Sequence, residues 1–201
     1  MRQLSRLERY VSGGTASVLD VGCGAGAFLQ YAEGQGWEGA GTDVVVTDVV
    51  RKSGIKFWEG KLSGITFATE QFAAIRFNHV LEHTQNPLVE LRRARSLITD
   101  GGVLLIGVPN IAGFSIRMKN LQSRMGLKNH SWKHYGALHH LWFFTPATLA
   151  ALVRAAGFEV LAWETPVTDR SDRSGWVSTV IRAPLEVLRV GGILDLYARP
   201  C

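Results

Sequence analysis

The stretch "VLDVGCGAGAF", residues 18–28, constrains the fold more than any other part of the sequence. An apolar run that ends in an acid and opens into glycines predicts a buried strand, a tight turn and then a helix. In α/β proteins the backbone of such a turn lies at the carboxyl edge of a parallel sheet, where ligands bind. The stretch therefore predicts both an architecture and the location of a binding site.

Strand and helix patterns alternate along the rest of the chain. Strands are predicted at residues 17–21, 37–42, 56–58, 73–77, 103–108, 158–163 and 193–198. Helices are predicted at residues 1–11, 25–35, 47–53, 87–100, 114–128 and 145–157. In the helix that starts at Pro87, Asn86 is the expected cap and the pair Gly101-Gly102 the expected stop. Alternating units of this kind fold into a largely parallel sheet with helices on both faces.

The bulk properties predict one domain in a reducing compartment. With 201 residues and no repeats or linker-like segments, the chain is expected to form a single domain, 1–201. No apolar run approaches the roughly 18–20 residues that span a bilayer. Cys23 and Cys201 do not make a disulfide framework, and the amphipathic start lacks the apolar core of a signal peptide. These features predict a cytoplasmic protein.

The glycine loop itself discriminates between ligands. It lacks the Lys-Ser/Thr ending of a triphosphate-binding loop. Gly22, Gly24 and Ala27 satisfy the dinucleotide fingerprint, so a nicotinamide-dependent oxidoreductase is one interpretation. Asp20 favours another, because a carboxylate two residues before the first glycine would repel a pyrophosphate and attract a cation. S-adenosylmethionine carries both an ammonium and a sulfonium group.

A second acid strengthens this interpretation. Asp43 ends the predicted strand at residues 37–42, where it is placed to accept hydrogen bonds from both hydroxyls of a ribose. Its alternative role is that of a turn or cap residue. Together with Asp20 and the glycines, Asp43 indicates a site for S-adenosylmethionine.

Four blocks in order resemble class I S-adenosylmethionine-dependent methyltransferases, in the branch that includes ubiquinone-biosynthesis O-methyltransferases and small-molecule methyltransferases. They are "VLDVGCGAGAFL", "GAGTDV", "FAAIRFNHVLEHTQNPLVELRRARSLITDGGVLLIGVPN" and "HHLWFFTPATLAALVRAAGFEVL". The resemblance implies a Rossmann-like, doubly wound α/β fold with a mostly parallel seven-stranded sheet and an antiparallel last strand. It also implies S-adenosylmethionine as the cofactor.

The resemblance assigns the cofactor contacts. Asp20 and the loop backbone are expected to hold the amino-acid end of the cofactor, and Asp43 its ribose. Where the family commonly has an acid near the adenine, "EGKLSG" offers only Glu59, before the glycine. The full set of expected cofactor-binding residues is Asp20, Gly22, Cys23, Gly24, Gly26, Asp43, Val44, Asn78 and His79.

The segment "HVLEH", from His79 to His83, spells the H-x-x-E-H motif of some zinc peptidases. It lies between a predicted strand and the helix at Pro87, which leaves little room for the helix that such a zinc site needs. No metal site is therefore expected from this motif, whereas dependence on a divalent ion, which some ubiquinone-type relatives use, stays open. The sequence also lacks the N/D-P-P-Y/F/W motif of amino methyltransferases. Methylation of a hydroxyl on a small molecule is predicted instead, and no nucleic-acid partner is expected.

Histidines are the candidate bases for that reaction. Residues 128–144 hold four histidines, within a connection (113–144) that the resemblance places on the substrate side. His140 is the first candidate, with His134 and His83 as others, since imidazole accepts protons near neutral pH. The alternative is that these side chains only line or seal the pocket.

The charge is unevenly distributed. The chain carries a net charge of +5, yet residues 101–158 contain six basic residues and no acidic one. This segment predicts an anionic acceptor, such as a nucleotide sugar, a glycan precursor or a polyprenyl intermediate. Its basic amphipathic helix at 114–128 is expected to pack on the surface, with peripheral membrane contact as the alternative. The oligomeric state stays open, as does a cofactor-binding protein without activity of its own.

Overall fold

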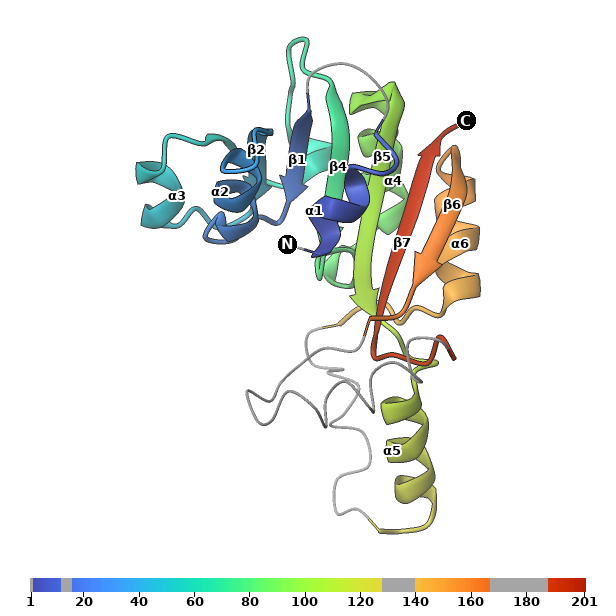
Figure 1. Ribbon diagram of the computed structural model, residues 1–201. Helices are drawn as coiled ribbons and strands as arrows, with labels where there is room; N and C mark the ends of the chain where they lie inside the picture. Colours follow the sequence, from blue (N-terminus) through green and yellow to red (C-terminus); the bar gives the residue numbers. More distant parts are fainter. Residues whose placement is uncertain (1, 12–15, 128–139, 167–187) are drawn as a thin grey trace.

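The computed structural model describes residues 2–11, 16–127, 140–166 and 188–201 (Figure 1). Its centre is a seven-stranded sheet in the order β3-β2-β1-β4-β5-β7-β6. The strands are β1 Ser17–Val21, β2 Glu38–Asp43, β3 Lys56–Glu59, β4 Phe72–Asn78, β5 Ile98–Pro109, β6 Phe158–Glu164 and β7 Ile193–Pro200. Each of the predicted strands is present.

The pairing of the strands confirms the predicted fold class. The pairs β1–β2, β1–β4, β2–β3 and β4–β5 are parallel, whereas β7 runs antiparallel to both β5 and β6. From β1 the sheet grows outward to β2 and β3 on one side and to β4 and β5 on the other. The carboxyl ends of β1 and β4 therefore form the switch point at which open α/β sheets bind their ligands.

Helices cover both faces of the sheet. Leu4 of α1 and Leu29 of α2 are buried with Leu105 on one face, whereas Leu91 of α4 and Leu149 of α6 belong to the core on the other. In Figure 1, α1 lies in front of the sheet and α4 and α6 lie behind it. The helices are α1 Arg2–Leu7, α2 Ala27–Glu33, α3 Asp48–Lys52, η1 Leu62–Gly64, η2 Leu81–His83, α4 Pro87–Leu97, α5 Phe114–Arg124 and α6 Pro146–Ala155. In the described part of the chain, no helix combines the length and apolarity needed to cross a membrane.

The predicted start of α4 is confirmed, but its predicted end is wrong. Asn86 caps the helix by accepting from the Val89 N–H. The helix ends at Leu97, and β5 begins at Ile98 and continues through Gly101 and Gly102. Isoleucine and the threonine that follows it are β-branched and prefer extended backbone. The glycines instead lie where the pairing of β4 with β5 shifts register.

Helix α5 also differs from its prediction as a packed surface helix. None of its residues is buried. Four apolar side chains, three in the helix and one directly after it, are 38% to 64% exposed: Phe114, Met118, Leu121 and Met125. In Figure 1 this helix extends away from the sheet.

Polar contacts as well as apolar ones fix α1. Arg2 and Arg6 both bond to Glu164 Oε2, at 3.1 and 3.0 Å. Between them Gln3 donates through Nε2 to Asp195 Oδ1 at 3.1 Å. Because Asp195 is 2% exposed, its carboxylate depends on this amide for part of its solvation.

Asp195 is expected to make stability depend on pH. Burial raises the pKa of this carboxyl to about 6, while the Gln3 bond lowers it and Glu164 raises it. Since the folded state holds the proton more tightly than the unfolded chain, this stabilisation is complete below pH 4 or so and is lost as the pH rises through 6. Over that window the wild type should lose about 2 to 3 kcal/mol more unfolding free energy than Asp195→Asn. Urea denaturation at several pH values measures the difference, and equal slopes for the two proteins would contradict it.

Candidate functional site

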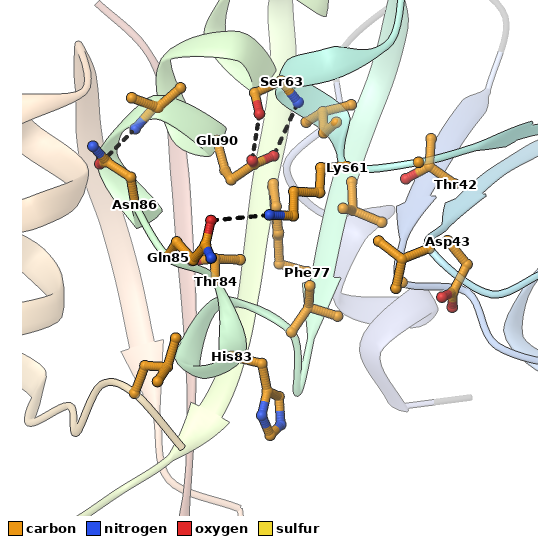
Figure 2. A pocket seen from close by; sticks show the side chains of 18 of the residues that line it. Thr42, Asp43, Lys61, Ser63, Phe77, His83, Thr84, Gln85, Asn86 and Glu90 are labelled. Carbon is orange, nitrogen blue, oxygen red and sulfur yellow. Dashed lines mark hydrogen bonds between the residues drawn. The ribbon is translucent and has the colours of Figure 1, made fainter. Parts of the chain in front are cut away.

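A pocket of about 580 Å³ opens at the carboxyl edge of the sheet, over the ends of β1, β2 and β4 (Figure 2). Its volume lies within the range of small-molecule sites. Its lining residues form three walls. The first, from the ends of β1 and β2, contains Val21, Gly22, Thr42, Asp43 and Val44, and the second, after β3, contains Gly60, Lys61, Leu62 and Ser63. The third, from the end of β4 to α4, contains Phe77, His79, Val80, His83, Thr84, Gln85, Asn86, Val89 and Glu90, with Leu141 beside them. The pocket therefore occupies the switch point predicted from the glycine loop.

The glycine loop forms the first wall. The Gly22 N–H donates to the Thr42 carbonyl at 2.7 Å, which joins the loop to the end of β2. Gly22 has φ of +72°, in the left-handed region, and a Cβ atom there would overlap the side chain of Val80. Both conditions require glycine.

The Asp43 carboxylate lies beside this loop. Its Oδ2 accepts from the Gly24 N–H at 2.8 Å, and its Oδ1 accepts from the Val45 N–H at 3.1 Å. A carboxylate oxygen has two acceptor positions. One position on each oxygen therefore remains for the hydroxyl groups of a ligand.

Thr42 adds an unsatisfied group to the same wall. Its hydroxyl is buried and has no hydrogen-bond partner among the described residues. Leaving a buried hydroxyl unpaired is costly, so such a group at a pocket wall is suited to a ligand. The sequence pattern did not single out this residue, because threonine in a strand is ordinary.

The loop after β3 forms the second wall, which sequence reasoning missed. Lys61 Nζ donates to Gln85 Oε1 at 3.1 Å, across to the segment after β4. Glu90, in the first turn of α4, accepts from the Ser63 N–H at 3.1 Å and from its hydroxyl at 2.6 Å. Figure 2 shows both connections. They fix the loop beside the pocket.

The end of β4 forms the third wall. His79 has φ of +56°, a conformation that residues other than glycine rarely adopt. Its N–H donates to the Gly107 carbonyl at 2.8 Å, and its Nδ1 lies 3.3 Å from Glu82 Oε1. Glu82 is 1% exposed, and its Oε2 has no hydrogen-bond partner among the described residues. Backbone strain beside an orphaned buried carboxylate is typical of functional sites.

Two of the predicted histidines come together here. The rings of His83 and His140 lie edge to face, with centroids 4.8 Å apart. Their nitrogens and a carboxylate oxygen of Glu82 all lie within 4.8 Å of one another, so this trio is able to hold a metal ion. The N–H groups of Leu141 and Trp142 both donate to the Glu82 carbonyl, which fixes the segment after His140 against the pocket. His134 lies outside the described residues.

The family of this chain follows from a direct match. The model of a family described as "Methyltransferase domain" covers residues 2–162, which include every wall of the pocket. The chain belongs to this methyltransferase family. The resemblance seen in the sequence is thereby confirmed, and with it S-adenosylmethionine as the cofactor.

Curated relatives of this methyltransferase carry the name ubiquinone biosynthesis O-methyltransferase. The protein of Azorhizobium caulinodans is 28% identical over 153 residues, which are 71% of this chain and 58% of that protein. The protein of Ruegeria pomeroyi is 26% identical over 185 residues, covering 82% of this chain and 73% of that protein. The chain thus matches little more than half of the first relative's length.

Solved structures share the fold. A SAM-dependent methyltransferase from Archaeoglobus fulgidus superposes with a TM-score of 0.67 at 20% identity, covering 98% of this chain and 91% of that one. The 1,6-didemethyltoxoflavin-N1-methyltransferase of Burkholderia thailandensis was solved with bound 1,6-didemethyltoxoflavin and S-adenosylhomocysteine. It superposes with a TM-score of 0.64 at 20% identity, covering 98% of this chain and 75% of that one. At these identities the likeness establishes the fold alone.

The predicted site residues of the methyltransferase divide into two groups. The wall of the pocket contains Gly22, Asp43, Val44, His79 and His83. The remaining ones, Asp20, Cys23, Gly24, Gly26, Asn78 and His140, lie in the same segments but are not among the lining residues. Their contact with the cofactor or acceptor stays a prediction.

Asp20 has a partner that the sequence analysis did not foresee. It is 1% exposed, and its Oδ1 accepts from Arg76 Nη1 at 2.7 Å. Burial raises the pKa of this carboxyl, against the opposing influence of Arg76. Cys23, in the loop, is also buried, and burial raises the pKa of its thiol to about 12. The thiol is therefore protonated at neutral pH and does not act as a nucleophile.

The pocket suits the adenosine part of S-adenosylmethionine. Asp43 offers an acceptor position on each oxygen, and Thr42, the residue before it on the pocket wall, carries an unpaired hydroxyl. No described atom lies within 4 Å of the place where a Cβ of Gly24 would stand, so the loop backbone is open to a close approach. These residues fit the cofactor that the family uses.

Proposed function

We propose that this methyltransferase transfers the methyl group of S-adenosylmethionine to a hydroxyl group of a small, anionic acceptor in a reducing cytoplasm. The observation that carries the proposal is that one pocket is lined by both Asp43 and His83. A carboxylate that can accept hydrogen bonds from a ribose and a histidine that can accept a proton thus line one cavity. The names of the curated relatives support O-methylation, and the two free cysteines suit a reducing compartment.

On the cofactor side, the residues of the chain bind S-adenosylmethionine and orient it. Asp43 accepts from the ribose hydroxyls, while the backbone at Gly22 and Gly24 lies against the cofactor. S-adenosylmethionine, when bound, supplies an electrophilic methyl group on its sulfonium. Because the methyl passes directly from sulfur to the acceptor oxygen, positioning of the two provides most of the catalysis.

On the acceptor side, the hydroxyl must lose its proton. His83 lines the pocket and is placed to take that proton, and His140, 4.8 Å away between ring centroids, orients its ring or accepts the proton in turn. His79, held by the buried Glu82, lies on the same wall. The connection 113–144 would cover the acceptor, and its described end at Leu141 reaches the pocket.

The carboxylate-free segment beside the pocket supports an anionic acceptor, while the pocket wall itself carries Asp43 and Glu90 as well as Lys61. Lys61 lies on the wall, and the carboxylate-free segment 101–158 continues into Leu141 at the pocket rim. A phosphate or carboxylate on the acceptor would be attracted by this field. A nucleotide sugar, a glycan precursor and a polyprenyl intermediate all carry such a group.

Transfer of a labelled methyl group tests the function. The purified protein is incubated with methyl-labelled S-adenosylmethionine and a deproteinised cell extract, and labelled products are separated and identified. The expected product is a small methyl ether, absent when Asp43→Ala replaces the wild type. Binding of S-adenosylhomocysteine without transfer to any component would instead favour a cofactor-binding protein without activity.

Contact with anionic lipid belongs to the same proposal and concerns α5. The helix leaves Phe114 and Leu121 about half exposed and contains Arg117, Lys119 and Arg124 but no acidic residue. An exposed apolar face flanked by cations is typical of helices that lie in a membrane interface. The enzyme would then reach a lipid-linked acceptor at the membrane surface in which that acceptor is anchored.

Charge reversal on α5 tests this contact. We expect Arg117→Glu/Arg124→Glu to lower binding to phosphatidylglycerol-containing vesicles by at least about 10-fold, since each cation near an anionic surface contributes about 1 kcal/mol. Vesicle co-sedimentation measures the effect. The control Arg92→Glu/Arg154→Glu makes the same change of net charge at exposed positions of α4 and α6. Equal losses in the two variants would count against α5 as the contact.

A further inference from the structure

A hydrogen bond joins two walls of the pocket on the side away from the ribose acceptor. Lys61, in the loop after β3, donates through Nζ to Gln85 Oε1 at 3.1 Å. Both residues line the pocket, and Figure 2 shows Gln85 across the cavity from Asp43, with the Lys61 side chain reaching toward it. Among the described residues, the side-chain amide of Gln85 has no other hydrogen-bond partner. Its Nε2 donors and one acceptor position of Oε1 are therefore available to a ligand.

Neighbouring contacts hold both ends of this bridge in place. Glu90 accepts from the Ser63 N–H at 3.1 Å and from the Ser63 hydroxyl at 2.6 Å, which joins the loop of Lys61 to α4. Gln85 directly precedes Asn86, which caps α4. Because these contacts already hold the two segments, the fold does not depend on a bond between two exposed side chains, whose net contribution to stability is small.

Apolar side chains cover much of the remaining wall. Each of the three walls contributes at least one: Val44, Leu62 and Val80. Ligand sites typically combine apolar walls with a few polar groups that fix the orientation of the ligand. Such walls suit a planar base, which leaves the recognition of its edge to the polar groups.

The carboxylates near the pocket are committed to other partners. Asp43 is the ribose acceptor of the proposed site. Glu90 uses one oxygen for the Ser63 N–H and the other for the Ser63 hydroxyl. Glu59, the only acid of "EGKLSG", is not among the lining residues, and its side chain is 62% exposed. An amino group on the base therefore has no free carboxylate to meet on the wall, whereas the Gln85 amide is available.

We propose that Gln85 recognises the adenine of S-adenosylmethionine and that Lys61 sets the orientation of the Gln85 amide. The inference rests on the proposed cofactor site, in which Asp43 holds the ribose. Adenine presents an amino donor beside a ring nitrogen that accepts, and a glutamine amide pairs with both through Oε1 and Nε2. A lysine ammonium has only donors, so Lys61 cannot accept from the amino group itself. By donating to Oε1, Lys61 instead fixes which side of the amide carries the acceptor.

An amide fixed in this way distinguishes adenine from hypoxanthine. Hypoxanthine has a carbonyl oxygen in place of the amino group, so Gln85 Oε1 would face another acceptor. A free amide turns over and donates to that oxygen, but turning Gln85 would bring its Nε2 donors against the Lys61 ammonium. Gln85 is thus the specificity-determining residue, and Lys61 is a positioning residue that acts through it.

Two ligands that differ only in the base test the proposal: S-adenosylhomocysteine and S-inosylhomocysteine, in which hypoxanthine replaces adenine. By isothermal titration calorimetry, the wild type should bind S-adenosylhomocysteine about 10-fold more tightly than S-inosylhomocysteine. Gln85→Leu should weaken S-adenosylhomocysteine about 10-fold and leave S-inosylhomocysteine unchanged, so that the preference disappears. The matched control Gln71→Leu, at an exposed position before β4, should keep both wild-type affinities.

A substitution of Lys61 tests the positioning role. Lys61→Met keeps an unbranched side chain but removes the donor, so the Gln85 amide is free to turn. The preference should fall to about 3-fold or less, mainly through tighter binding of S-inosylhomocysteine. Lys61→Arg keeps a donor and should retain the preference. A role in stability alone would change both affinities together and would not change the preference between the two bases.

The outcomes separate this inference from the proposed function. If the wild type binds neither ligand, the cofactor site itself is wrong. If the wild type binds both equally, or if Gln85→Leu weakens both by the same factor, the cofactor site stands and the assignment of the base to Gln85 is wrong. An undiminished preference in Lys61→Met would overturn the positioning role of Lys61. Both positions are exposed, and an unchanged affinity of Gln85→Leu for S-inosylhomocysteine shows that this variant is folded.

Discussion

Asp43→Ala should weaken binding of S-adenosylhomocysteine about 100-fold or more while the protein stays folded. Two hydrogen bonds that the carboxylate accepts from the ribose hydroxyls would be lost, and bonds to charged groups contribute about 1.5 to 3 kcal/mol each. The Gly24 and Val45 N–H groups lose their acceptor as well, which loosens the loop at the point of contact. Calorimetry measures the affinity, and circular dichroism with urea denaturation monitors the fold.

Two further variants define what the Asp43 result means. Asp43→Asn keeps one amide oxygen as an acceptor but removes the charge, so an intermediate loss of about 10-fold is expected. Glu59→Ala removes an exposed carboxylate at the end of the neighbouring strand β3, paired with Arg51 at 3.9 Å, and should leave the affinity unchanged. Wild-type affinity of Asp43→Ala would remove the ribose assignment. A loss in Glu59→Ala would give that acid the adenine role.

Local sequence patterns were sufficient to predict the strands and one wall of the pocket, whereas the antiparallel last strand was implied only by the family resemblance. The apolar run before Gly22 and the acid that ends β2 each follow from a strand that must be buried and a turn that must be tight. Parallel strands bring their carboxyl ends to one edge, so Asp43 and Gly22 had to be neighbours once both strands were recognised. The cap at Asn86 could be predicted in the same way, because a helix cap depends on residues close in sequence.

Contacts between residues that are distant in sequence could not be predicted from local patterns. Asp20 meets Arg76 only because β1 and β4 pair in one particular register, and a change of one residue would turn Arg76 to the other face. The Lys61–Gln85 bond likewise depends on where two loops end in space. Polar residues in loops are common, and nothing in their spacing marks them as pocket residues.

The two corrected helices show tertiary structure overriding local pattern. Residues after Leu97 continue a helical spacing, yet Ile98 pairs with Phe72 and becomes part of β5. For α5 the amphipathic pattern was right, but its apolar face was expected to pack and is instead exposed. The periodicity of a sequence shows that one face of a helix is apolar, but it does not show what packs against that face.

Gly22→Ala should lower the unfolding free energy by about 2 to 5 kcal/mol and weaken the binding of S-adenosylhomocysteine at least about 10-fold. A left-handed φ costs an alanine about 1 to 2 kcal/mol, and an overpacked contact costs about 1 to 3. The overlapping side chain is that of Val80, which lines the pocket. Displacing it would narrow the cavity, so stability and affinity should fall together. Urea denaturation and calorimetry measure the two effects.

The neighbouring Gly24 separates the two causes. It also has a positive φ, +55°, but no described atom lies within 4 Å of a Cβ placed there. Gly24→Ala should therefore show only the conformational cost, about 1 to 2 kcal/mol. In a Val80→Ala background, the cost of Gly22→Ala should fall to the same value, because the overlap is gone. If Gly22→Ala costs as much with Val80→Ala as without it, the close contact between the loop and the end of β4 plays no part, and backbone conformation alone explains the glycine.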